Sequence, residues 1–330
     1  MKTKKGILSL VGMVAAVGLS HFPSPAMAQS SLPAKNLRIV VGYPAGQTTD
    51  TLARSFAAIL SKDLGRPIYV DNKAGANGIL GAQEVARAAP DGATLLFAAM
   101  SQMAINPSLY RKLPYDPEKD FTPIALVGAG PLVLVANPSF PPNNLKELIA
   151  YAKERPDKVN YASGGIGITG HLAMEILQSR AGIKLNHVPY KGSPAAMNDV
   201  IGGQVSLMFD PLATTLPQIK GGKVKALAVT GSARRQDVGQ DVGTLDEQGL
   251  KGLEIQSWVA FFAPSHMSPA LIGTLSAAIQ RATRSKDMRE TFRNTGAEPI
   301  FVPSAKFAPF LHAEIEKWGK AAKDANVQID

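Results

Sequence analysis

The chain has no cysteine among its 330 residues. Disulfide bridges, thiolate nucleophiles and cysteine-ligated metals are therefore excluded. Histidine is also scarce, and the histidines that occur lack the spacing of a metal site: they are His21, His171, His187, His266 and His312. We therefore predict neither a metal ion nor any other cofactor.

The usual signatures of nucleotide-binding and hydrolytic enzymes are missing too. The glycine patterns fit neither the dinucleotide fingerprint nor the phosphate-binding loop, because no Gly-Lys-Ser or Gly-Lys-Thr occurs. Ser163 lies in Tyr161-Ala-Ser-Gly-Gly165, which is not the Gly-x-Ser-x-Gly turn of a hydrolase, and no His/Asp pair stands out as its partner. The sequence therefore argues against an enzyme.

No apolar run beyond the N-terminal region is long enough to cross a bilayer. The N-terminal run itself, 7–19, is short; it follows three lysines and precedes the small-residue site Ala26-Met-Ala28. This pattern predicts a cleavable signal peptide over residues 1–28. Because no cysteine follows the cleavage site, the chain is not a lipoprotein, and we expect a soluble protein exported to the periplasm.

Clustered positive charge is lacking as well. Three lysines of the predicted signal peptide contribute to the formal charge of +9, and the other basic residues are scattered without aromatic partners. Nucleic-acid binding is therefore not expected. A mild positive field that attracts small anions remains, and it should weaken with added salt.

What the sequence does contain, at residues 38–50, is a strand that runs through a Gly/Pro loop into a helix. The strand is Ile39–Val41, and Thr48 and Thr49 stand where an N-cap belongs. Apolar residues then recur at helical spacing: Leu52, Ala53, Phe56, Ile59 and Leu60. A helix start at the carboxyl end of a strand offers free backbone N–H groups to an anion. A simple tight turn explains the same residues equally well.

The same plan recurs at residues 159–177. A strand, Val159–Ala162, enters the loop Ser163-Gly-Gly-Ile-Gly-Ile-Thr-Gly170, and a helix follows. Four glycines and two hydroxyl residues allow backbone N–H groups to approach an anion closely. The alternative is a flexible loop with Thr169 as an N-cap. Strands that alternate with helices in this way predict an α/β fold with a mostly parallel sheet.

We predict a two-lobed α/β fold with a ligand cleft between the lobes, each lobe being a mostly parallel sheet flanked by helices. The C-terminal run of helices has too few strands for a domain of its own, so it is expected to pack back on the first sheet. The predicted boundaries are 29–127 and 258–330 for the first lobe and 128–257 for the second.

Several residues near these loops allow two interpretations. A helix N-terminus disfavours a charged histidine, so His171 is expected to be structural rather than catalytic. Asp210 either lines the cleft or caps the following helix, with equal weight. Asp50 is expected to be a first-turn helix carboxylate, and Trp258 to pack at the strand that crosses between the lobes.

Eight motifs occur in order along the chain: Val-Gly-Tyr-Pro-Ala-Gly-Gln-Thr-Thr-Asp (41–50), Asp-Asn-Lys-Ala-Gly-Ala-Asn-Gly (71–78), Pro-Asp-Gly-Ala-Thr-Leu-Leu (90–96), Asn-Pro-Ser-Leu-Tyr (106–110), Leu-Pro-Tyr-Asp-Pro (113–117), Asn-Tyr-Ala-Ser-Gly-Gly (160–165), His-Val-Pro-Tyr-Lys-Gly (187–192) and Gly-Gly-Gln-Val (202–205). Together they resemble the Bug (Bordetella uptake gene) family, the periplasmic solute-binding proteins of tripartite tricarboxylate transporters. The resemblance covers essentially the whole mature chain.

The resemblance implies a periplasmic-binding-protein fold whose lobes close on a small carboxylate, held by backbone amides, hydroxyls and ordered waters. On one lobe it implies contacts from Tyr43, Ala45, Gly46, Gln47, Thr48 and Thr49. Facing them it implies Ser163, Gly165, Ile168, Thr169 and His171, with Ser101, Tyr190 and Asp210 as further lining. Family members usually carry glycine where Gln47 stands, so the ligand of a relative does not transfer to this chain.

The leading hypothesis is that the protein, as a monomer, captures a small organic acid and delivers it to inner-membrane subunits of a tripartite tricarboxylate transporter. No reaction and no cofactor are implied. The alternative is that the liganded form is presented to a membrane sensor kinase. A third hypothesis, an exported hydrolase acting through Ser163, requires turnover that disappears in Ser163→Ala.

Overall fold

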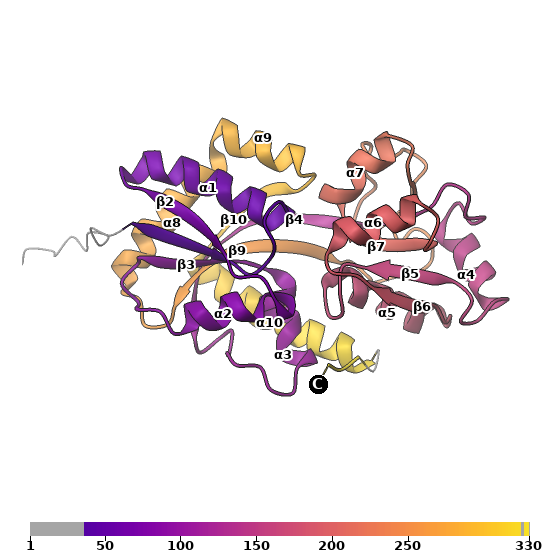
Figure 1. Cartoon of the computed structure of the whole chain (residues 1–330), viewed down its shortest axis with the longest axis horizontal. Helices are drawn as coiled ribbons and strands as arrows, with labels where there is room; N and C mark the ends of the chain where they lie inside the picture. Colours follow the sequence, from indigo (N-terminus) through magenta and orange to yellow (C-terminus); the bar gives the residue numbers. More distant parts are fainter. Residues whose placement is uncertain (1–35, 325–326, 330) are drawn as a thin grey trace, which may run out of the picture. The chain divides into compact units, whose positions relative to one another are not determined.

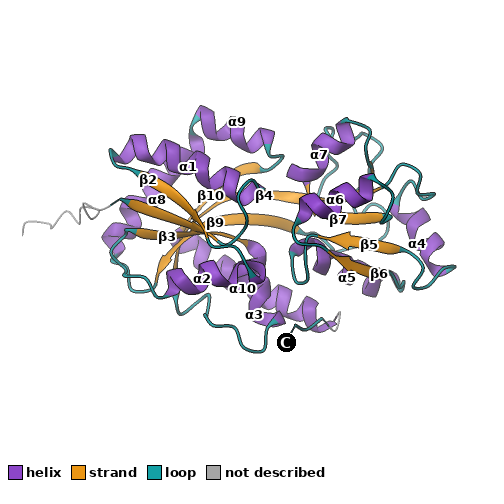
Figure 2. Ribbon diagram, viewed as in Figure 1, coloured by secondary structure: helices purple, strands orange, loops and turns teal. Residues whose placement is uncertain are grey.

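The computed structural model describes residues 36–324 and 327–329, so the predicted signal peptide lies outside the described residues. These residues form a sheet flanked by helices (Figure 1, Figure 2). The strands follow the hydrogen-bonded order β2-β1-β3-β9-β4-β7-β5-β6, and β10 and β8 pair with β4 beside this path. Within the described ranges, no helix is both long and apolar enough to cross a membrane.

Three parallel strands near the N-terminus pair with one another through β1. Ile39 and Val41 of β1 are buried against the apolar side of α1, and Val40 is buried on the opposite face against α2, as a central parallel strand requires. The elements of this segment are β1 (Leu37–Val41), α1 (Thr48–Leu64), β2 (Ile68–Asn72), α2 (Ile79–Ala86), β3 (Thr94–Ala99) and α3 (Asn106–Leu109). A 3₁₀ turn at Ala76–Gly78 and a π-helical turn at Ser101–Ile105 join them.

Strand β4 (Phe121–Ala136) is common to both parts of the sheet. Its first part pairs antiparallel with β9 (Gln256–Pro264), up to Pro131 opposite Gln256. From Leu132 onward it pairs with β7 (Leu207–Pro211) on one side, and from Val133 it pairs with β8 (Lys225–Val229) on the other. The exchange of partners therefore falls at Pro131, a residue without a backbone N–H.

The buried Thr230 links this exchange point to the returning strand. Its Oγ1 accepts a hydrogen bond from Leu132 N (2.8 Å) and donates one to the carbonyl oxygen of Ile255 (2.5 Å), directly before β9. Backbone bonds from Thr230 N to Leu132 O (3.0 Å) and from Ile255 N to Thr230 O (3.1 Å) complete the link. Strands β4 and β9, the two strands that cross between the sets of parallel strands, are thus linked through Thr230.

A second set of parallel strands, β6-β5-β7, repeats the arrangement of the first. Helix α5 approaches β7 so closely that a β-carbon at Gly170 would lie 2.3 Å from the carbonyl oxygen of Phe209. Glycine is therefore required at that position. The elements of this segment are α4 (Leu145–Lys153), β5 (Asn160–Ser163), α5 (Thr169–Ala181), β6 (Asn186–Pro189), α6 (Ser193–Ile201) and α7 (Leu212–Lys220), together with β7 and β8.

The C-terminal segment returns to the first strands. Helices α8 (Pro269–Arg284) and α9 (Lys286–Asn294) pack against α1, whereas α10 (Ser304–Asp324) packs against β4, α3 and α5. Between them, β10 (Glu298–Pro303) pairs antiparallel with β4. Strand β10 was not predicted from the sequence, because its two prolines weaken the strand pattern. Both prolines are tolerated because β10 pairs with β4 alone.

The sheet is mixed rather than mostly parallel, which differs from the prediction. The parallel ladders are confined to β2-β1-β3 and β6-β5-β7. Strands β4 and β9 run between these two sets in opposite directions, so their pairing with each other is antiparallel. The lobe boundaries, 29–127 with 258–330 and 128–257, stay a prediction.

Phe56 of α1 lies at the centre of a buried aromatic cluster. Its ring centroid is 5.8 Å from that of Phe97, 5.1 Å from that of Phe261 and 6.2 Å from that of Phe292. These rings come from β3, β9 and α9, and all are fully buried. Tilted and edge-to-face pairs of this kind add to the free energy gained by burial. The cluster therefore holds the N-terminal and C-terminal segments together.

We predict that Phe56→Ala lowers the free energy of unfolding by about 3–5 kcal/mol, because it leaves a cavity among three other rings. Urea denaturation followed by circular dichroism measures this. Leu80→Ala is the control, since Leu80 is 51% exposed and should change stability by no more than about 0.5 kcal/mol. Equal effects of the two substitutions would contradict this assignment of the core.

Candidate functional site

Helices in the described part of the chain begin in two different ways. The helices α4, α8 and α9 follow Asn144, Ser268 and Ser285, whose side chains accept a hydrogen bond from a first-turn N–H. The helices α1, α5, α6 and α7 begin without any such side-chain cap. Their first N–H groups, at the positive end of each helix dipole, are left for other acceptors.

The caps differ from the predicted ones. Gln47 and Ile168 are the N-cap residues of α1 and α5, with extended backbones (φ −77°, ψ 164° and φ −74°, ψ 163°). Thr48, Thr49 and Thr169 instead lie in the first helical turns. Because each threonine is already helical, its side chain does not occupy the capping position, and the first-turn N–H groups keep their bonding capacity.

Two of these helix starts open on one small cavity of about 80 Å³. Thr48 and Thr49 line it from α1, and 211–213 line it from the start of α7. Residues 128–131 of β4 and 257–259 of β9 form the rest of its wall, so both crossing strands border it. The structure therefore brings Thr48 and Thr49 beside the start of α7, at a cavity whose lining is largely apolar.

The loop before α1 is held by Asp50. This buried carboxylate accepts hydrogen bonds from Gly46 N (2.9 Å), Arg54 Nε (3.0 Å) and Asn72 Nδ2 (2.9 Å). Burial alone would raise the pKa of Asp50, but these bonds lower it below its usual value, so the side chain stays charged. Asp50 therefore has the first-turn role expected of it, and the N–H of Gly46 is engaged within the loop.

The other residues of this loop that were predicted to contact a ligand differ in their exposure to solvent. Ala45 and Gly46 are exposed, whereas Gln47 is half-buried. The Tyr43 hydroxyl lies 2.8 Å from Ser101 Oγ at the start of the π-helical turn, so the structure joins these two predicted residues. Burial raises the pKa of Tyr43 to about 12, which keeps the phenol protonated.

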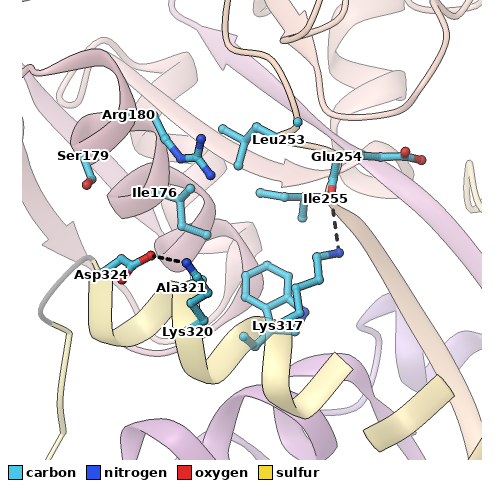
Figure 3. A pocket seen from close by; sticks show the side chains of 12 residues that line it. Ile176, Ser179, Arg180, Leu253, Glu254, Ile255, Lys317, Lys320, Ala321 and Asp324 are labelled. Atoms are coloured by element: carbon cyan, nitrogen blue, oxygen red, sulfur yellow. Dashed lines mark hydrogen bonds and ion pairs between the residues drawn. The ribbon is translucent and has the colours of Figure 1, made fainter. Parts of the chain in front are cut away.

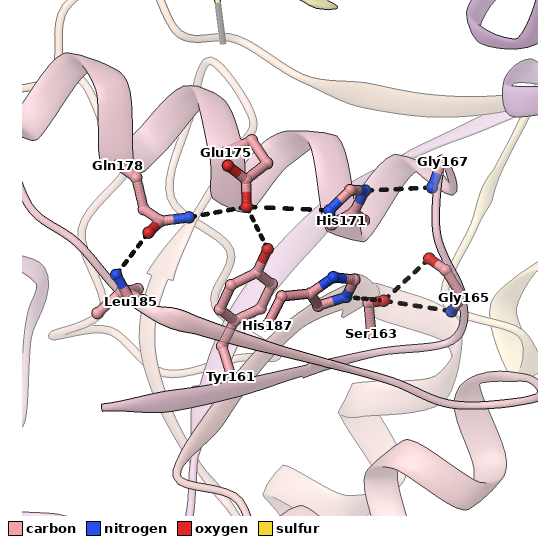
Figure 4. Close-up of polar contacts among 9 residues, drawn as sticks. All are labelled: Tyr161, Ser163, Gly165, Gly167, His171, Glu175, Gln178, Leu185 and His187. Carbon is pink, nitrogen blue, oxygen red and sulfur yellow. Dashed lines mark hydrogen bonds and ion pairs between the residues drawn. The ribbon is translucent and has the colours of Figure 1, made fainter. Parts of the chain in front are cut away.

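The loop before α5 is held from beneath by buried polar side chains (Figure 4). Ser163 Oγ donates to Gly165 O (2.9 Å) and also lies 2.7 Å from His187 Nε2. His171 Nδ1 accepts from Gly167 N (3.1 Å). Ser163 is fully buried and His171 nearly so, which means that both side chains support the backbone of this loop.

The two histidines form one stack with Tyr161. The imidazoles of His171 and His187 are 4.1 Å apart, and His187 lies 4.8 Å from the Tyr161 ring (Figure 4). The Tyr161 hydroxyl donates to Glu175, which also accepts from Gln178 Nε2 (2.9 Å). Burial lowers the pKa of His171 to about 3 and that of His187 to about 4, so both rings are neutral at pH 7.

His187, Glu175 and Gln178 are absent from the predicted set. His187 stands opposite Tyr161 in the β5–β6 register, a pairing that only the assembled sheet creates. It supplies the histidine partner that the sequence did not reveal for Ser163. Even so, Ser163 Oγ is enclosed and bonded to its own loop, which suits a structural hydroxyl rather than a nucleophile.

Asp210 and Tyr190 are also engaged within the second set of strands. Asp210, wholly buried, accepts from Ser193 Oγ (2.7 Å) and from Thr214, so it joins the starts of α6 and α7. Burial raises the pKa of Asp210 to about 6. The Tyr190 hydroxyl donates to Asp199 Oδ2 (2.6 Å) on α6. Asp210 does not cap α7, because Pro211 is the N-cap residue and no side chain accepts from the first turn; its place in the cleft lining stays a prediction.

Contacts also run between the loops of the two strand sets. Asn77 Nδ2 donates to Gly167 O (3.2 Å) and to Asn106 Oδ1 (2.7 Å). Gln47 Nε2 lies so close to Gly192 that a β-carbon there would be only 2.9 Å away. Asn77 therefore joins the turn before α2 to the loop before α5, and Gln47 brings the loop before α1 against the loop before α6.

The model of the tripartite tricarboxylate transporter family receptor, TctC, matches residues 52–327. The chain belongs to this family.

Solved structures of TctC-type and Bug proteins resemble the chain over nearly all of their length. The structure of Rpa4515 from R. palustris with adipate is 33% identical, with a TM-score of 0.83 over 90% of this chain and 99% of that one. The periplasmic binding protein BugD is 36% identical, with a TM-score of 0.82 over 90% and 99%. MatC from Rhodopseudomonas palustris with bound malate is 34% identical, with a TM-score of 0.80 over 88% and 99%.

These likenesses confirm the predicted α/β periplasmic-binding-protein fold and the Bug resemblance. The TctC family is one of binding receptors rather than enzymes. Its structurally similar members include carboxylate complexes, with adipate in one case and malate in the other.

We predict that the histidine stack makes the protein sensitive to acid. A histidine with a folded pKa below its unfolded value of about 6.5 contributes stability that is present above pH 6.5 and is lost as pH falls towards 3–4. His171→Asn keeps an acceptor for Gly167 N but does not titrate. Its unfolding free energy, measured in urea from pH 7 to pH 4, should fall less steeply than that of the parent protein. His266→Asn is the control, because His266 is exposed and asparagine suits its φ of 67°; the slope should stay near that of the parent. Parallel slopes for His171→Asn and the parent would contradict the prediction.

Proposed function

We propose that this protein is a periplasmic solute-binding protein that captures a small organic carboxylate by hinge closure and delivers it to a tripartite tricarboxylate-type transporter. The observation that carries the proposal is the pair of uncapped helix starts, α1 and α7, on one cavity bordered by both crossing strands. Backbone N–H groups at a helix start bind an anion without any cationic side chain.

The chemistry of the relatives supports an acid as the ligand. Adipate and malate are both carboxylates, although they differ in length and in the hydroxyl that malate carries. In this chain we assign ligand contact to Thr48 and Thr49, which line the cavity at the starts of α1 and α7. We extend the assignment to Gln47, Gly165 and Thr169, which lie outside its lining at the starts of α1 and α5. Ser163, His171, Asp210 and Tyr190 then act beneath these loops, since their polar atoms are already engaged.

Closure requires two bodies and a hinge. We assign residues 29–127 with 258–330 to one lobe and 128–257 to the other, joined where β4 exchanges partners at Pro131 and where Ile255 leads into β9. Thr230 bonds to both places, so it would keep the two crossings moving together. The predicted signal peptide and the periplasmic relatives together support export to the periplasm.

A ligand screen tests the proposal directly. Purified mature protein is mixed with malate, succinate, adipate, citrate and benzoate, and the melting temperature and the calorimetric Kd are measured. At least one acid should raise the melting temperature, because a ligand that binds only the folded state stabilises it. Adipamide, which lacks the charge, should not. If no organic acid stabilises the protein, the proposal is wrong.

We predict that Asn77 strengthens the closed form by joining the two lobes. Its Nδ2 donates to Gly167 O, and removing one such bond should raise the Kd of the acid found in the screen about 5- to 10-fold, mainly through faster dissociation. The test variant is Asn77→Gly, because the φ of 51° at this position suits glycine.

The matched control is Asp157→Gly. Asp157 is exposed and has a similar φ of 57°, so this change removes a side chain from the same backbone conformation without touching either loop. Affinity should stay at the parent value in the control. Equal losses of affinity in both variants would show that backbone loosening, not the cross-lobe bond, causes the effect.

Gln47 is predicted to set selectivity. Its amide fills space against Gly192, so Gln47→Gly would widen the wall between the facing loops. Glycine is well tolerated as an N-cap, and stability should change by only a few tenths of a kcal/mol. The order of Kd values across the acid panel should change in the variant. An unchanged order would refute this role.

A further inference from the structure

A second cavity lies apart from the candidate site, between α5, residues 252–255 and α10 (Figure 3). Its volume is about 190 Å³. Its lining shares no residue with the cavity at the starts of α1 and α7. What this cavity could bind therefore has to be inferred from its own lining residues.

The floor of this cavity is apolar. Leu253, Ile255 and Trp318 are buried, and Ile176 of α5 and Ala321 of α10 complete the lining. An apolar cavity of about 150 Å³ is large enough to hold benzene. An aromatic ring or a short alkyl chain of a ligand therefore fits in this cavity.

One cation at the rim has no counter-charge. Lys317 lies 3.3 Å from Glu314 Oε1, and Lys320 lies 3.6 Å from Asp324 Oδ2, so those charges are paired. Glu254 accepts from Gln256 Nε2 (3.0 Å), and its carboxylate extends away from the cavity (Figure 3).

The exposed side chain of Arg180 has no hydrogen bond or ion pair with residues 36–324 and 327–329. Figure 3 draws its guanidinium beside Leu253 at the cavity. A guanidinium binds a carboxylate through two parallel hydrogen bonds. The rim therefore complements an anion, while the floor complements an apolar body.

A carboxylate also connects this cavity to the candidate site. Glu314 Oε2 accepts from the indole nitrogens of Trp318 (3.2 Å) and Trp258 (3.0 Å). Trp318 lines this cavity, and Trp258 lines the cavity at the starts of α1 and α7. These are the only two tryptophans of the sequence. Intrinsic fluorescence therefore reports on both places at once.

We propose that the cavity between α5 and α10 is a second small-molecule site, which binds an amphipathic monocarboxylate with its ring or chain on the apolar floor and its carboxylate on Arg180. This inference does not depend on the proposed transport function, because it uses neither the helix starts nor the facing loops.

The test uses 4-fluorobenzoate as the probe and the mature protein. Fluorine NMR line broadening and tryptophan fluorescence are followed in a titration. The parent protein should bind the probe, and 4-fluorobenzamide, which is neutral, should bind at least about 10-fold more weakly. Arg180→Gln should weaken binding of 4-fluorobenzoate by a similar factor, and Ala321→Leu should abolish it by filling the cavity.

Two further variants separate this site from other causes. Arg289→Gln makes the same change of charge at an exposed position of α9 and should bind like the parent. Thr49→Phe obstructs the candidate site at α1 and should also retain binding of the probe. The proposal is overturned if the parent does not bind 4-fluorobenzoate. It is equally overturned if Arg180→Gln binds like the parent, or if Thr49→Phe loses binding, which would place the probe in the candidate site.

Discussion

The exchange of partners along β4 is the constraint on which the rest of the structure depends. One strand pairs with β9 as far as Pro131 and with β7 from Leu132, so a single backbone belongs to both parts of the sheet. Thr230 then binds the exchange point to the start of β9. Because Thr230 links β4 to the start of β9, it limits how the starts of α1 and α7 can be placed around the cavity that these strands border.

Polar side chains near the candidate site act mainly on the protein itself. Asp50 fixes the loop before α1, Ser163 and His171 fix the loop before α5, and Asp210 joins the starts of α6 and α7. A buried polar group must be hydrogen-bonded to avoid a cost of about 1–3 kcal/mol, and these residues meet that need internally. The starts of α1, α5, α6 and α7 have no side-chain cap, and a helix start of this kind can offer backbone N–H groups to negative charge.

Sequence patterns predicted individual strands and helices well, but they predicted poorly which strands pair with one another. The strand at Ile39–Val41 and the apolar spacing from Leu52 to Leu60 predicted β1 and α1, because both signals come from neighbours in the chain. The N-cap was shifted by one residue, from Thr48 to Gln47, since intrinsic capping preference is weaker than the backbone path imposed by the loop. Strand β10 was not predicted because its prolines are acceptable only beside β4, a partner more than 160 residues away in sequence.

The sequence by itself determined the α/β class, the glycine-rich helix starts and the absence of thiol chemistry, because composition and short-range periodicity carry that information. Tertiary structure alone decided that β4 joins both strand sets, that His187 lies against Ser163, and that Trp258 and Trp318 share Glu314. The physical reason is distance along the chain. Pairing of residues 24 or 56 positions apart is fixed by the packing of whole elements, which no local pattern of residues encodes.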